Sequence, residues 1–213
     1  MTLNSVIPRH QTSDEPQAHP GRRMSEAEFV AWCGPFTRAE WVDGEIIIMA
    51  PASFDHVDLN DWLVTIIRMV IEHHRLGVVL SREFFIRLPK QRRRRLPDLL
   101  FISTSRTGLL HEQYFDGAPD LLIEVVSPDS EARDWRDKYL EYEKAGVREY
   151  WVIDPMSHRV EAYVLVKGRY TPIEEDQGKL SSTAIPGFWL KTDWLWRRPL
   201  PPVRRVLREL GVR

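Results

Sequence analysis

The sequence contains one cysteine, Cys33, and no apolar run of the ~18 residues that a membrane-spanning helix needs. A single cysteine excludes an intramolecular disulfide framework and a cysteine-based zinc cluster. Residues 1–23 are polar and broken by prolines, so they contain no apolar signal-peptide core. No Gly-rich phosphate loop, Gly-x-Ser-x-Gly elbow or His-Glu-x-x-His motif is present. We therefore expect a cytoplasmic protein without a membrane partner.

The chain nevertheless has the composition of a folded globular protein. Its 213 residues are 43% hydrophobic and 29% charged, which is enough apolar material for a full core. We expect a disordered leader over 1–23, one domain over 24–190 and a basic C-terminal tail over 191–213. The net charge of −1 conceals two basic regions, 90–95 and the tail. Each could follow a phosphate backbone or simply be solvated.

Hydrophobic periodicity and turn signals predict alternating helices and strands. Helices are expected at 24–32, 56–75, 130–145 and 203–210, and strands at 78–88, 96–103, 120–127 and 149–153, with hairpins at 41–49 and 160–172. Ser25 and Glu28 form a capping-box pattern for the first helix, and Asp55 is expected to cap the second. This order predicts an α/β (α+β) fold with a central mixed sheet flanked by helices.

Two carboxylates stand where strand propensity does not favour them. Asp98 follows Pro97 at the start of an apolar strand, and Glu124 lies inside another. An isolated carboxylate in a buried strand is costly unless it is paired or binds a cation. Two of them on neighbouring strands suit Mg²⁺ or Mn²⁺, whereas each alone could instead cap a strand end or pair with an arginine.

A lysine on the following helix bears on this choice. The helix expected after Glu124 would pack back over the sheet, so Lys138 could turn toward that carboxylate. The alternative is that Lys138 forms a surface ion pair with Asp134, four residues earlier. We expect Lys138 to turn inward.

Several motifs resemble one known family. The most specific block runs from Asp120 to Pro155 and includes Asp120-Leu-Leu-Ile-Glu-Val-Val-Ser-Pro128 and Glu149-Tyr-Trp-Val-Ile-Asp-Pro155. Further motifs are Pro97-Asp98, Ala145-Gly-Val147, Met49-Ala-Pro51 and Met24-Ser-Glu-Ala-Glu-Phe29. Together, over about residues 24–172, they resemble the Uma-two family of restriction endonucleases (domain of unknown function 820), within the PD-(D/E)XK nuclease superfamily.

The resemblance implies a restriction-endonuclease-like fold with a metal site at the edge of its sheet. Asp98, Glu124 and the backbone carbonyl of Val125 would bind Mg²⁺, with Mn²⁺ as a possible substitute. The superfamily's lysine falls two residues after the glutamate, where this sequence has Val126. The resemblance implies that Lys138 takes that role.

Two more residues match characteristic positions of the family. His56 opens the long helix and Glu40 lies in the first hairpin, and both would line the site. For His56 the alternative is a capping or packing role at a helix start. The resemblance also implies a homodimer, because cutting both strands of DNA requires two sites.

These observations together predict a Mg²⁺-dependent endonuclease acting on DNA. We expect Arg92, Arg93, Arg94 and Arg95 to form an exposed hairpin tip that holds the phosphate backbone. The rival hypothesis is a non-catalytic binding or assembly module on the same fold, which the valine at position 126 and the near-neutral net charge favour.

Overall fold

The computed structural model describes residues 23–34, 37–81, 83–127 and 133–212. The leader expected over 1–23 therefore lies outside the described residues, apart from Arg23. The described helices are α1 (Glu26–Trp32), α2 (Phe54–His74), α3 (Lys138–Ala145) and α4 (Val203–Glu209). None of them combines the length and apolarity needed to cross a bilayer.

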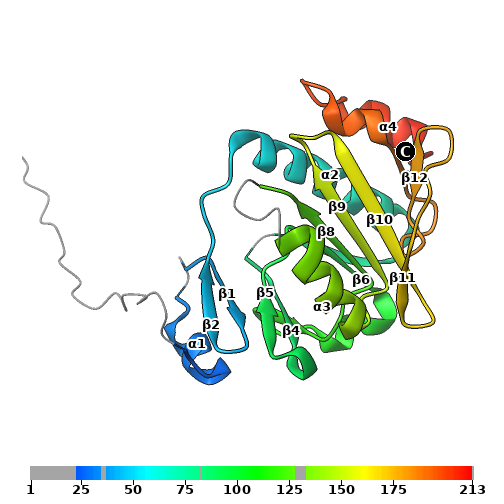
Figure 1. Ribbon diagram of the computed structural model, residues 1–213. Helices are drawn as coiled ribbons and strands as arrows, with labels where there is room; N and C mark the ends of the chain where they lie inside the picture. Colours follow the sequence, from blue (N-terminus) through cyan, green and yellow to red (C-terminus); the bar gives the residue numbers. More distant parts are fainter. Residues whose placement is uncertain (1–22, 35–36, 82, 128–132, 213) are drawn as a thin grey trace, which may run out of the picture.

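The largest layer is a six-stranded sheet with one helix on each face (Figure 1). Its spatial order is β11 (Arg169–Pro172), β10 (Arg159–Val166), β9 (Glu149–Asp154), β8 (Leu121–Val125), β6 (Leu99–Ser103) and β3 (Gly77–Ser81). In this sheet β8 and β9 are parallel and the other neighbours are antiparallel. The predicted mixed sheet flanked by helices is confirmed.

Strand β8 is buried on both faces, as its continuous hydrophobicity predicts. Leu121, Ile123 and Val125 belong to the core cluster beneath α2. The side chains between them point the other way, so Leu122 packs in the cluster beneath α3. The same alternation turns Glu124 toward α3.

A smaller sheet lies beside the larger one (Figure 1). Its spatial order is β2 (Glu45–Ile48), β1 (Ala39–Val42), β5 (Arg93–Arg95), β4 (Phe85–Leu88) and β7 (Tyr114–Asp116). Helix α1 covers one face through Phe29, which packs with Ala39 and Trp41. The predicted capping box and the predicted hairpin are both confirmed.

Two details differ from the sequence-based expectation. The strand expected over 78–88 is two strands in different sheets, because Glu83 adopts φ of 60° and the chain changes direction there. The cap of α2 is Ser53 rather than Asp55, since the Ser53 hydroxyl accepts a hydrogen bond from the His56 backbone N–H at 3.2 Å.

The expectation of an exposed arginine tip at 92–95 is wrong. Arg93–Arg95 form β5, which pairs with β1 on one side and β4 on the other. Arg94 and Arg95 are 8% and 2% exposed, and Arg92 is the mainly solvent-facing member of the run. All four arginines have carboxylate partners from distant parts of the chain: Arg92 with Asp43 at the surface, Arg93 with Glu141, Arg94 with Glu26, and Arg95 with Glu40 and Glu141.

The C-terminal segment is also packed rather than solvated. Strands β12 (Lys179–Ser181) and β13 (Trp189–Lys191) pair with each other, and the chain then crosses α2. Trp194, Leu195 and Val206 are buried in the cluster beneath α2. The tail therefore completes the core of the domain.

A buried arginine between two carboxylates predicts a large effect on stability. Replacing Arg95 with Met should lower the free energy of unfolding by about 3–5 kcal/mol, because Glu40 and Glu141 would be left close together without a counter-charge. Arg92→Met, in the same run but exposed, should cost less than about 1 kcal/mol. Urea unfolding of both variants measures the difference, and equal losses would contradict the structural role of Arg95.

Candidate active site

The two carboxylates identified from the sequence lie at the same edge of the six-stranded sheet. Strands β6 and β8 pair with Leu99 opposite Ile123, and Asp98 and Glu124 are the next residue on each side of that pair. Asp98 Oδ2 also accepts a hydrogen bond from the Val125 backbone N–H at 2.8 Å, which fixes the carboxylate beside β8.

His56 reaches this edge from the first turn of α2. Its Nε2 lies 2.9 Å from Asp98 Oδ1, and both side chains are mostly buried. Its Nδ1 is buried and has no hydrogen-bond partner within the described structure. The geometry thus places His56 in the site, in contact with Asp98.

Lys138 turns toward Glu124, as expected. Its Nζ lies 3.0 Å from Glu124 Oε2, and each side chain is 3% exposed. The side chain of Asp134 lies outside the described residues, so the alternative surface pair is not described. The lysine beside Glu124 therefore comes from α3 and not from the position two residues further along the chain, which is Val126.

Tyr142 completes the surroundings of Glu124. Its hydroxyl donates a hydrogen bond to Glu124 Oε1 at 3.0 Å. Burial and the negative charge of Glu124 raise the pKa of Tyr142 well above its ordinary value, so the phenol stays protonated and remains a donor.

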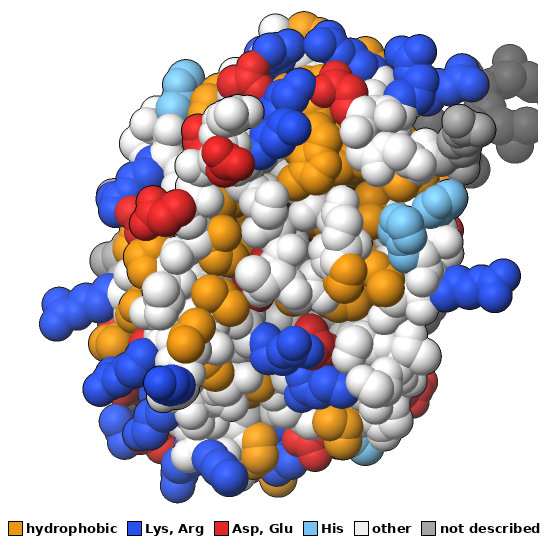
Figure 2. Space-filling model, turned by 90° about the vertical axis from the view of Figure 1, so that its right-hand side faces the viewer, with side chains coloured by type: hydrophobic (Ala, Val, Ile, Leu, Met, Phe, Trp, Pro, Cys, Tyr) orange, Lys and Arg blue, Asp and Glu red, His pale blue; other side chains and the backbone are white. Residues whose placement is uncertain are grey.

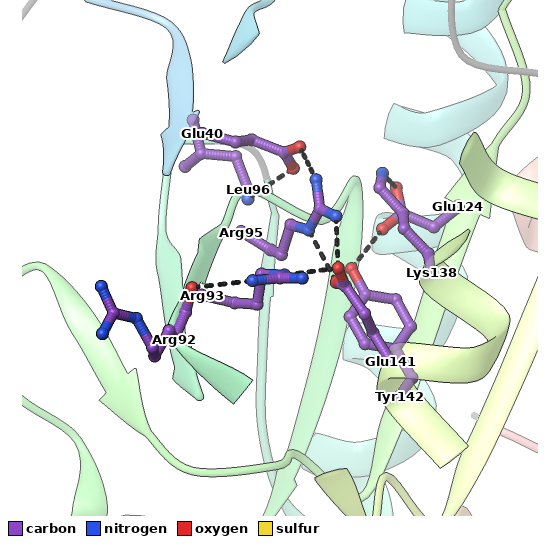
Figure 3. A network of polar contacts seen from close by, with 9 residues as sticks. All are labelled: Glu40, Arg92, Arg93, Arg95, Leu96, Glu124, Lys138, Glu141 and Tyr142. Atoms are coloured by element: carbon purple, nitrogen blue, oxygen red, sulfur yellow. Dashed lines mark hydrogen bonds and ion pairs between the residues drawn. The ribbon is translucent and has the colours of Figure 1, made fainter. Parts of the chain in front are cut away.

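A second group of charges adjoins this pair and is shown in Figure 3. Arg95 Nη1 lies 2.7 Å from Glu40 Oε2, and its Nη2 lies 2.8 Å from Glu141 Oε1. Glu40 also accepts a hydrogen bond from the Leu96 backbone N–H at 3.1 Å. Arg93 contacts the same Glu141, whereas Arg92 points away from the network.

Glu40 remains ionised although it is fully buried. Burial alone would raise the pKa of its carboxyl, but the positive charges of Lys138 and Arg95, together with the two hydrogen bonds, lower the pKa below its ordinary value. The charge of Lys138 therefore acts on Glu40 as well as on Glu124. Because Lys138 also contacts Glu124, its charge links Glu40 electrostatically to the candidate site.

Sequence reasoning left Glu141 and Tyr142 out of the site and assigned Arg95 to an exposed nucleic-acid-binding tip. The signal for the first two was present, because residues at 138, 141 and 142 share one face of a helix. For Arg95 the available signal was misleading, since four consecutive arginines are typical of a solvated run.

The donor set is small for a metal centre. No group of three or more His, Cys, Asp and Glu side chains among the described residues could hold a metal ion. Two carboxylates suffice for Mg²⁺, which usually keeps several waters and takes one or two carboxylates from the protein. Each oxygen of Asp98 and Glu124 already contacts a protein group, so a cation would have to share these oxygens with the present partners.

Comparison with known proteins identifies the family and the fold of the chain. The chain matches the family model Uma2, described as "Putative restriction endonuclease", over residues 26–193. No curated protein matches the chain. Among solved structures, a putative nuclease belonging to DUF820 from Anabaena variabilis ATCC 29413 superposes with a TM-score of 0.70 at 21% identity, covering 81% of this chain and 97% of that one. This likeness shows a shared fold. The family match spans well over half of the sequence, and the chain belongs to the Uma2 family of putative restriction endonucleases.

Proposed function

We propose that this protein is a Mg²⁺-dependent endonuclease that hydrolyses phosphodiester bonds of DNA at a PD-(D/E)XK-type site. The observation that carries the proposal is the contact of Lys138 with Glu124 beside Asp98 at one sheet edge. Two carboxylates that can hold a divalent cation, together with an ammonium group beside them, can support phosphodiester hydrolysis. Membership of a family described as restriction endonucleases supports the same reaction.

Asp98 and Glu124 would hold the cation, with the backbone carbonyl of Val125 as a further ligand, and Mn²⁺ could replace Mg²⁺. When bound, such an ion lowers the pKa of a coordinated water and offsets the charge that develops on the phosphate. His56 keeps Asp98 oriented through its 2.9 Å contact.

The chain's own groups account for the remaining requirements. Lys138 brings a positive charge to the side of Glu124, where it can hold an attacking water or a phosphate oxygen. Tyr142 donates to the other oxygen of Glu124 and so fixes its orientation. Arg95 and Glu141 hold α3 against β5, which keeps Lys138 in position.

A homodimer is part of this proposal, because cutting both strands of a duplex needs two sites. Sedimentation of the purified protein measures its oligomeric state directly and does not depend on DNA cleavage.

One observation favours the rival, a non-catalytic binding or assembly module. Each oxygen of Asp98 and Glu124 already contacts a protein group, so the cluster is electrostatically satisfied without a cation. In that case the carboxylates would serve only to join β6, β8, α2 and α3. A metal titration separates the two functions.

Replacing Asp98 with Asn should abolish metal binding and cleavage together. Calorimetric titration of the wild type with Mn²⁺ should show a binding isotherm that the variant lacks, and cleavage of duplex DNA in Mg²⁺ should fall at least ~100-fold. Glu45→Gln, which alters an exposed carboxylate of the first hairpin, is the matched control and should behave as wild type. A wild type that shows neither metal binding nor cleavage would establish the rival.

Replacing Lys138 with Met should separate chemistry from metal binding. The substitution removes the charge beside Glu124 while keeping a long side chain, so kcat should fall ~100-fold or more as Mn²⁺ still binds. Lys138→Arg should recover part of the rate because it restores the charge. Steady-state cleavage kinetics measure both, and an unchanged kcat in Lys138→Met would contradict the assigned role.

A further inference from the structure

The C-terminal segment extends beyond the family match, which ends at residue 193. From 197 to 212 the described chain has five arginines and one acidic residue: Arg197, Arg198, Arg204, Arg205, Arg208 and Glu209. Figure 2 shows Lys and Arg side chains gathered along the upper edge of one face, where α4 lies in Figure 1. The basic segment is therefore a surface feature of this chain that lies outside the residues matched by the family model.

The arginines of α4 differ in their partners. Arg205 pairs with Glu209 one turn later, and Glu209 also binds Lys191. Arg204 and Arg208 are both exposed, and neither has an acidic partner within the described part of the chain. They stand four residues apart, so they project from one face of the helix, whereas Arg205 projects about 100° from Arg204 and about 60° from Arg208.

The two unpaired arginines border a shallow hollow. It is lined by the apolar side chains of Leu207 and Val212 together with Arg204 and Arg208. Val206 and Val212 are buried, and Trp62 of α2 donates its indole N–H to the Pro201 carbonyl at 2.7 Å. The arginines are thus presented on a helix that is fixed to the core.

The segment begins next to the candidate active site. Arg198 Nε lies 3.5 Å from Asp55 Oδ1, and Asp55 immediately precedes His56. Trp62, which contacts Pro201, lies seven residues further along α2, or ~10 Å at the helical rise. The basic segment therefore begins beside the candidate active site, runs alongside α2 and ends in α4.

We propose that the face of Arg204 and Arg208 holds the phosphate backbone of the DNA substrate outside the cleavage site. The inference rests on the proposed nuclease function, because it assigns a second contact to the same substrate. Residues four apart rise ~6 Å along a helix, and a DNA strand presents a phosphate every ~3.4 Å of duplex axis. The two guanidinium groups can accordingly reach separate phosphates of one strand. Backbone contacts of this kind position a duplex and carry no base information.

The test is DNA binding by the double variant Arg204→Ala/Arg208→Ala in EDTA, where cleavage cannot occur. Fluorescence anisotropy with a short labelled duplex should show a roughly tenfold loss of affinity, and the slope of log K against log salt should fall by nearly two units. The loss should be the same for two unrelated sequences. Arg205→Ala, on the same helix but already paired, is the control and should change both quantities little.

Two results would overturn the inference: wild-type affinity and salt slope in the double variant, or an equal loss in Arg205→Ala. A loss confined to one DNA sequence would also exclude a backbone contact. Thermal unfolding at the wild-type temperature confirms that the variants fold, as expected for exposed side chains. Because binding is measured without metal, DNA binding with no cleavage would refute only the nuclease function, and cleavage with an unaffected double variant would refute only this surface.

Discussion

The position of Arg95 between Glu40 and Glu141 is the interaction on which the arrangement of the site depends. Glu40 belongs to the smaller sheet and Glu141 to α3, so a single guanidinium joins two layers that are far apart in sequence. Such a pair is tolerated only because the geometry is close and the remaining polar atoms are bonded. With α3 held in this way, its neighbouring residues Lys138 and Tyr142 both reach Glu124.

The site is therefore assembled from two different sources. The sheet supplies Asp98 and Glu124 through strand register, which the alternation of a buried strand fixes firmly. Helices supply the side chains that contact these carboxylates, His56 from α2 and Lys138 from α3. Lys138 reaches Glu124 through tertiary packing rather than strand spacing, so a lysine lies beside this carboxylate although position 126 is a valine.

Local patterns predicted most of the fold and the central pair of the site. Capping, the Asp43-Gly44 turn and continuous apolar runs depend on neighbours in sequence, and those elements were confirmed. The arginine run was misjudged because its meaning depends on Glu26, Glu40 and Glu141, whose positions no local rule gives. The strand break near Glu83 escaped prediction for a similar reason, since the apolar pattern continues across it.

The ion pairs of the arginine run also affect the electrostatic field that the protein produces in the solvent. Acidic and basic groups that neutralise each other beneath α3 and α1 contribute little to the field in solvent, whereas Arg204 and Arg208 contribute fully. The C-terminal helix thus carries a local positive charge although the net charge of the chain is −1. A polyanion near this helix would be attracted to it before contact, and the attraction would weaken as salt shortens the range of the field.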